Sequence, residues 1–137
     1  MGAGVGSEVL GREVPERALQ ALELEVLSEL LCMEFAGAQD LRLQLPHATV
    51  VGRCECGCAT VDLQVDPRWA LPAPVSKSPI PAEASVTDDR GREIGGILVF
   101  LDRGYLSCLE IYSAADPITA WPDAAHRHPM LVPRRAR

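Results

Sequence analysis

The segment Arg53–Cys58 (RCECGC) places three of the chain's five cysteines within five residues. Thiolates bind zinc and other soft metal ions, and neighbouring thiols can also take part in redox chemistry. In an extended strand, Cys54 and Cys56 would point to the same face with their side chains roughly 6.5–7 Å apart. Thiolates that share one zinc ion lie only roughly 4 Å apart. A turn at Gly57 is therefore needed to bring these sulfurs together.

A complete zinc site needs more ligands than this loop supplies, because the usual pattern has two Cys-x₂₋₄-Cys pairs. Cys108 is a candidate fourth ligand, since it lies on a predicted strand of the same sheet. Other ligands would have to come from Cys32, His126 or His128. A disulfide between Cys54 and Cys58 is geometrically feasible across a hairpin, although a reducing cytoplasm disfavours it. Inert thiols, a zinc site and redox or ligand chemistry stay open as alternatives, and zinc is the one cofactor considered.

Glu110 is a second candidate functional residue, because it shares a strand face with Cys108 and Tyr112. A carboxylate on an apolar strand face is either exposed at an edge or held by a partner. A buried carboxylate with a raised pKa would suit acid–base chemistry. The simpler expectation is a salt bridge to Arg53 from a neighbouring strand. We also assign a candidate ligand or interface surface to Glu110, Tyr112, Trp69 and Trp121.

Composition and motifs exclude several functional classes. The net charge of −6 argues against a nucleic-acid-binding surface. No apolar run approaches the roughly 18–20 residues of a membrane span, and no secretory signal is evident, so a soluble cytoplasmic protein is expected. The sequence has no Gly-x-Ser-x-Gly, His-Glu-x-x-His or phosphate-loop motif, and we predict no catalytic residue.

The helices that would position these residues are expected before residue 46. Apolar residues at spacings of three and four predict a helix of about twenty residues that begins at Pro15 and ends before Gly37. Residues 40–45 fit either a strand or a short helix that Pro46 stops, and we favour the helix.

Alternating apolar residues predict about five antiparallel strands, with Gly91 and Gly104 in tight turns that favour positive φ. The sequence therefore predicts an α+β fold, in which the long helix and the short second helix pack on one face of the sheet. We expect a flexible tail over residues 1–13, one domain over 14–122 and an irregular tail over 123–137. The predicted strands are Thr49–Glu55, Ala59–Val65, Ala82–Thr87, Ile94–Leu101 and Tyr105–Ser113.

Several segments resemble a group of small uncharacterised actinobacterial proteins. The resemblance spans roughly residues 15–122, supports the helix over residues 40–45 and implies no activity. The segments that carry it are Leu41–Leu45, Ala48–Val51, Gly96–Leu101, Gly104–Leu106, Leu109–Tyr112 and Trp121-Pro122.

The strand over residues 94–101 carries apolar side chains on both faces, so both faces of the sheet need a cover. The helices cover one face, and a loop, the C-terminal tail or a second subunit would cover the other. We predict that Trp69 or Trp121 covers the face that holds Glu110 and Cys108. The favoured function is a non-enzymatic binding or protein-interaction module, as a homodimer or with a protein partner. The alternative is a metal- or thiol-dependent protein that uses Cys54, Cys56 and Cys58.

Overall fold

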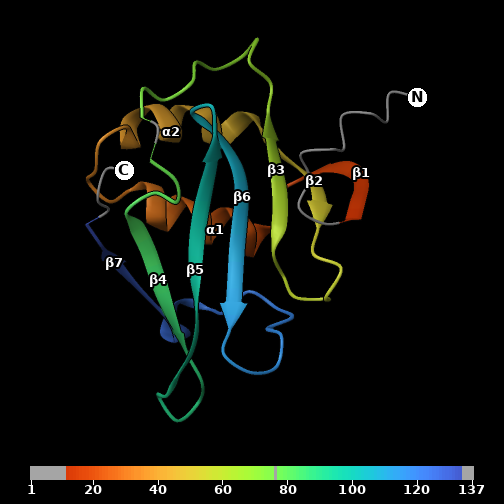
Figure 1. Cartoon of the computed structure of the whole chain (residues 1–137), viewed down its shortest axis with the longest axis vertical. Coiled ribbons are helices and arrows are strands. Elements are labelled where there is room, and N and C mark those ends of the chain that lie inside the picture. Colours follow the sequence, from red (N-terminus) through yellow and green to blue (C-terminus); the bar gives the residue numbers. More distant parts are fainter. Residues whose placement is uncertain (1–11, 76, 134–137) are drawn as a thin grey trace.

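Two α-helices lie on one face of a seven-stranded antiparallel sheet in the computed structural model, which describes residues 12–75 and 77–133 (Figure 1). The helices are α1 (Ala21–Leu31) and α2 (Ala38–Gln44), and a short 3-10 turn, η2 (Leu45–His47), follows α2. The strand order is β1-β2-β3-β6-β5-β4-β7. The predicted α+β class is confirmed, and the sheet has more strands than the five expected.

The five predicted strands are all present, close to their expected bounds. The two tight turns have the sequence Asp-Arg-Gly, at residues 89–91 and 102–104. Their glycines adopt left-handed backbone angles, with φ of +78° at Gly91 and +86° at Gly104. These angles are unfavourable for residues with a Cβ, which explains the glycines. The strands are β2 (Ala48–Arg53), β3 (Val61–Val65), β4 (Ala82–Thr87), β5 (Glu93–Asp102) and β6 (Tyr105–Ser113).

The prediction for the N-terminal region is wrong in two respects. Strand β1 (Arg12–Ala18) includes the end of the expected tail and the expected first turn of the helix. Proline is tolerated in an edge strand at an irregularity, and the pairing of β1 with β2 shifts register around Pro15. Helix α1 begins later, because Glu23 accepts a 2.8 Å hydrogen bond from the backbone N–H of Gln20 and also pairs with Arg17. Residues 1–11 lie outside the described residues.

The segment between the helices also differs in detail from the prediction. Gly37 was expected to end the first helix, but α1 ends at Leu31 and Gly37 is instead the N-cap of α2, with φ of +88°. A side chain at Gly37 would lie 3.0 Å from Val75 as well. The short helix over residues 40–45 is confirmed as α2, and Pro46 falls in η2 after its end.

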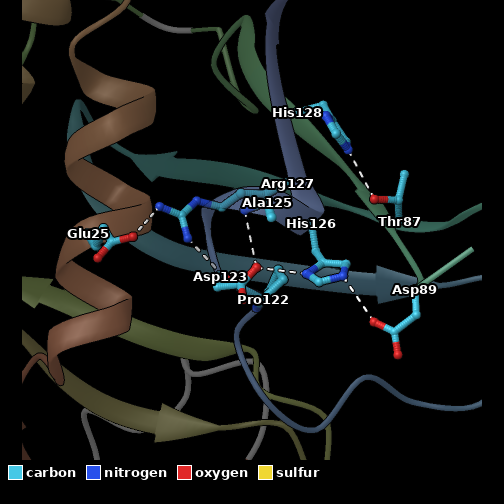
Figure 2. A network of polar contacts seen from close by, with 9 residues as sticks. All are labelled: Glu25, Thr87, Asp89, Pro122, Asp123, Ala125, His126, Arg127 and His128. Atoms are coloured by element: carbon cyan, nitrogen blue, oxygen red, sulfur yellow. Dashed lines mark hydrogen bonds and ion pairs between the residues drawn. The ribbon is translucent and has the colours of Figure 1, made fainter. Parts of the chain in front are cut away.

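The C-terminal segment is not the irregular tail that was predicted over residues 123–137. It contains the short turn η3 (Ala124–His126) and strand β7 (Arg127–Leu131), which pairs with β4 at the edge of the sheet. The side chain of Arg127 is buried and forms ion pairs with Glu25 and Glu29 of α1, the latter at 2.8 Å. Figure 2 shows Arg127 between Glu25 and the backbone carbonyl of Pro122, which accepts a 2.8 Å hydrogen bond. Ion pairs that span about a hundred residues of sequence thus anchor β7.

The two faces of the sheet have different surroundings. The helix-side face packs its apolar residues, such as Ile97 and Leu109, against Leu27 and Leu30 of α1 in one core. The opposite face carries Leu98 and Glu110, which oppose each other across β5 and β6, and neither helix covers it (Figure 1). Neither helix in the described part of the chain is long and apolar enough to cross a bilayer.

Candidate functional site

The loop between β2 and β3 gathers three sulfur atoms at one end of the sheet. Gly57 has φ of +92°, a value that favours glycine, and its N–H donates a 3.3 Å hydrogen bond to the carbonyl of Cys54. At the base of the loop the N–H of Cys54 donates to the carbonyl of Thr60. The Sγ atoms of Cys54, Cys56 and Cys58 all lie within 4.8 Å of one another. The predicted folding of the sulfurs around Gly57 is therefore confirmed.

The three thiols of this loop are not equivalent. The thiol of Cys54 donates a hydrogen bond to Sγ of Cys56 at 3.0 Å, and the N–H of Cys58 donates to the same sulfur at 3.3 Å. These two hydrogen bonds lower the pKa of Cys56, whereas the bond to Cys56 raises the pKa of Cys54 to about 11. The exposed Cys56 is thus the sulfur in this loop that most readily becomes a thiolate.

A pocket of about 320 Å³ lies between this loop, strand β6 and the segment after β6. Four thiols and two carboxylates line it, and no lysine, arginine or histidine of the described residues does so. The polar groups in the lining are Cys54, Cys56, Cys58, Cys108, Thr60, Asp62, Glu110, Tyr112 and Ser113. The electrostatic character of the pocket is therefore negative.

Strand β6 supplies the wall of the pocket opposite the cysteine loop. Cys108 pairs in register with Asp62 of β3, and Glu110 lies two residues further along the same face of β6. Burial raises the pKa of Cys108 to about 12, with smaller contributions from the charges of Asp62 and Glu110. At neutral pH, Cys108 therefore stays a protonated thiol beside two carboxylates.

Two sets of hydrogen bonds hold the end of the loop against β6 and the segment that follows it. The buried hydroxyl of Thr60 accepts a 2.9 Å hydrogen bond from the N–H of Ile111 and donates to the carbonyl of the same residue at 3.2 Å. The N–H of Ala59 donates to the carbonyl of Ile118 at 2.9 Å. The main chain after Cys58 is therefore fixed to the opposite wall of the pocket.

Most of the predicted site residues meet in this pocket, and the tryptophans do not. Cys54, Cys56, Cys58, Cys108, Glu110 and Tyr112 all line it. Trp121 is buried within the hydrophobic core and Trp69 is 65 % exposed. Neither lines the pocket, so the prediction that a tryptophan covers this part of the sheet is wrong.

The predicted salt bridge between Glu110 and Arg53 is also wrong. Within residues 12–75 and 77–133, the half-buried carboxylate of Glu110 has no hydrogen-bond or ion-pair partner, and Arg53 is exposed. The two strands that carry these residues, β2 and β6, are separated in the sheet by β3. Their side chains were expected to be neighbours because the strand order could not be deduced from the sequence.

The remaining candidate ligands lie elsewhere. Cys32 is exposed at the end of α1. His126 contacts Asp123 at 2.7 Å and Asp89 at 3.1 Å, and His128 contacts Thr87 at 3.0 Å (Figure 2). The histidines therefore belong to the β7 end of the sheet and not to the pocket.

Sequence reasoning overlooked two residues of the pocket, Asp62 and Thr60. Both alternate with the apolar residues of the predicted strand Ala59–Val65, and neither was considered as a site residue. In the structure Asp62 is 4 % exposed and Thr60 is 9 % exposed. The alternation did place both residues on the same strand, but their burial depends on β6, which is distant in sequence.

No protein-family model, curated protein or solved structure matches the chain. The resemblance to small actinobacterial proteins therefore stays a prediction. The geometry and charge of the pocket are the basis for a functional assignment.

Proposed function

We propose that this chain is a non-enzymatic binding module that holds a thiophilic metal ion, zinc(II) in the first instance, on Cys54, Cys56 and Cys58. The observation that carries the proposal is the separation of the three Sγ atoms, all within 4.8 Å of one another. Thiolates around a tetrahedral zinc ion with bonds of ~2.3 Å lie about 3.8 Å apart. Small side-chain rotations would therefore suffice to create three zinc–sulfur bonds.

The charge of the pocket supports a cationic ligand. Four thiols and two carboxylates line it without a basic side chain from the described residues. Phosphates, carboxylic acids and other anions would meet repulsion there, whereas a metal cation would neutralise part of the negative charge. Cys108, on the opposite wall, is the candidate for a fourth sulfur ligand.

The fold does not depend on the ion for its core. Hydrogen bonds from Thr60 and Ala59 fix the loop, and among the described residues every buried side-chain nitrogen or oxygen has a hydrogen-bond partner. Structural zinc sites, by contrast, supply folding free energy outright. We therefore propose a site that folds first and then loads its ion. Because its ligands must be reduced, we also propose a reducing compartment such as the cytoplasm.

Elemental analysis tests this function on protein purified with reductant and without chelator. We expect about one zinc ion per chain in the wild type and loss of that zinc in Cys54→Ser and in Cys56→Ser. Cys32→Ser is the matched control, because Cys32 is an exposed cysteine outside the pocket, and it should keep the metal. Protein without metal in the wild type, with five freely titratable thiols after unfolding, would contradict the proposal.

A second candidate function is self-association through the sheet face opposite the helices. Leu98 and Phe100 are half-buried on this face, which neither helix covers. A second copy of the chain would remove them from water. Sedimentation velocity at micromolar concentration tests this idea, and a strictly monomeric species would exclude it.

A further inference from the structure

Strand β6 presents an unpaired negative charge to the proposed metal site. Glu110 lines the pocket, is half-buried and has no ion-pair or hydrogen-bond partner among the described residues. Its direct cross-strand neighbour is the apolar Leu98. A carboxylate in such surroundings gains from a cation in the pocket, because no described residue pairs with its charge.

The position of Cys108 links Glu110 to the cysteine loop. Cys108 is opposite Asp62 of β3 and two residues before Glu110 on β6, and it lines the pocket together with Cys54 and Cys58. All of these residues line the same pocket of about 320 Å³. An ion held by the three sulfurs of the loop would therefore lie in the field of Glu110.

We infer that Glu110 makes this site selective for a divalent thiophilic ion, such as zinc(II) or cadmium(II), over monovalent copper(I). The inference rests on the proposed metal-binding function. Three thiolates leave a net charge of about −1 around a divalent ion and about −2 around a monovalent ion. The carboxylate adds a further negative charge, and the less negative complex tolerates it better. A carboxylate oxygen is also an acceptable ligand for zinc, whereas copper(I) prefers sulfur alone.

For the same three thiolates, the divalent and the monovalent complex differ by one unit of charge. The interaction of Glu110 with the two complexes therefore differs by the Coulomb energy of one charge, whatever its effect on each affinity alone. Removal of a group that supports a metal site typically changes binding about 10–100-fold. We therefore expect Glu110→Gln to lower the ratio of cadmium to copper(I) affinity about threefold.

The test compares Glu110→Gln with Glu55→Gln. Glu55 is an exposed carboxylate between Cys54 and Cys56 that does not line the pocket, so its variant is a matched control for charge near the same sulfurs. Cadmium(II) binding is followed by thiolate-to-metal charge-transfer absorption, and copper(I) binding by competition with a chromogenic chelator. Circular dichroism confirms folding, and Glu110→Thr is a second neutral variant suited to a strand.

The outcomes separate the selectivity from the metal-binding function. A lower ratio of cadmium to copper(I) affinity in Glu110→Gln, with less than about a twofold change of this ratio in Glu55→Gln, supports the inference. An unchanged ratio in Glu110→Gln, or an equal change of the ratio in the two variants, would overturn it while the metal site stands. A wild-type protein that binds neither ion through sulfur would overturn the proposed function and the selectivity with it.

Discussion

Two of the clusters of ionisable groups, at different parts of the sheet, differ in how their charges are balanced. At the β7 edge, the buried Arg127 has two carboxylates, Glu25 and Glu29, and a backbone carbonyl as partners. Four thiols and two carboxylates line the cysteine pocket, and no lysine, arginine or histidine of the described residues lines it. In the first cluster, ion pairs balance the charge of Arg127 and hold strand β7 against helix α1. The second has only acidic groups and thiols among its ionisable lining residues, which suits a cation-binding site.

Because the two clusters differ in charge balance, mutations in them should have different effects. Changes in the Arg127 cluster should alter stability and leave metal binding in the folded protein unchanged. Changes in the pocket should mainly alter thiol chemistry and metal affinity.

Alkylation of the native protein should distinguish the thiols of the pocket most strongly. Hydrogen bonds lower the pKa of Cys56, whereas the pKa of Cys108 is raised to about 12. Cys56 should therefore react with iodoacetamide at least about a hundredfold faster than Cys108. Mass spectrometry of digests measures the rates, with the exposed Cys32 as the internal reference. Zinc should slow the reaction of Cys56 and leave Cys32 unaffected. Comparable rates at Cys108 and Cys32 would show that the pocket wall is open to solvent.

Arg127→Ala should produce the largest loss of stability. It removes two ion pairs and a hydrogen bond from a buried position, and we expect the free energy of unfolding to fall by about 2–3 kcal/mol. Urea denaturation measures this change. Arg90→Ala, at an exposed turn, is the control and should change stability by less than about 0.5 kcal/mol. An equally small change in the free energy of unfolding of Arg127→Ala would contradict the proposed difference between the two clusters. Weaker metal binding by the folded Arg127→Ala variant would also contradict it.

Thr60→Val should affect stability and metal binding together, because Thr60 joins the cysteine loop to β6. Loss of its hydroxyl leaves the N–H and carbonyl of Ile111 without that partner, at a cost of about 1–2 kcal/mol. The freed loop should also bind cadmium more weakly, by about tenfold. Urea denaturation and cadmium titration measure the two effects. Unchanged cadmium affinity would mean that the loop keeps its geometry without Thr60.

The smallest expected effect is a pH dependence of stability that arises from His126, next to β7. The hydrogen bond to Asp123, with a further contribution from Asp89, raises the pKa of His126 (Figure 2). The protonated form therefore stabilises the fold below the unfolded-state pKa of about 6.5, and this contribution disappears as pH rises through the raised folded-state value. Thermal denaturation of the wild type and His126→Gln across this pH range measures it. An identical pH dependence in both proteins would assign the effect to another group.

The sequence predicted the parts of the fold that depend on local patterns. Alternation identified five strands, and the glycines of the two Asp-Arg-Gly turns identified their hairpins. It also located the cysteine loop and the turn at Gly57. These features require only neighbouring residues, so their signals are visible in short segments.

The edge strands could not be predicted in the same way. Pro15 and Pro129 normally argue against strands, but both lie in edge strands that tolerate proline. The anchor of β7 is Arg127, whose partners Glu25 and Glu29 precede it by 102 and 98 residues. The burial of Asp62 likewise depends on pairing between β3 and β6. Contacts at such separations are fixed by strand order, which local patterns do not reveal.

X-ray absorption spectroscopy of the zinc-loaded protein can establish whether the cysteine loop holds the ion, because it reports the atoms bound to the ion. Three or four sulfur neighbours at ~2.3 Å are expected, from Cys54, Cys56 and Cys58 with Cys108 as the fourth. The same spectrum from Cys56→Ser should lose one sulfur or lack bound zinc altogether. A zinc shell made only of nitrogen and oxygen at about 2.0–2.2 Å would contradict the account.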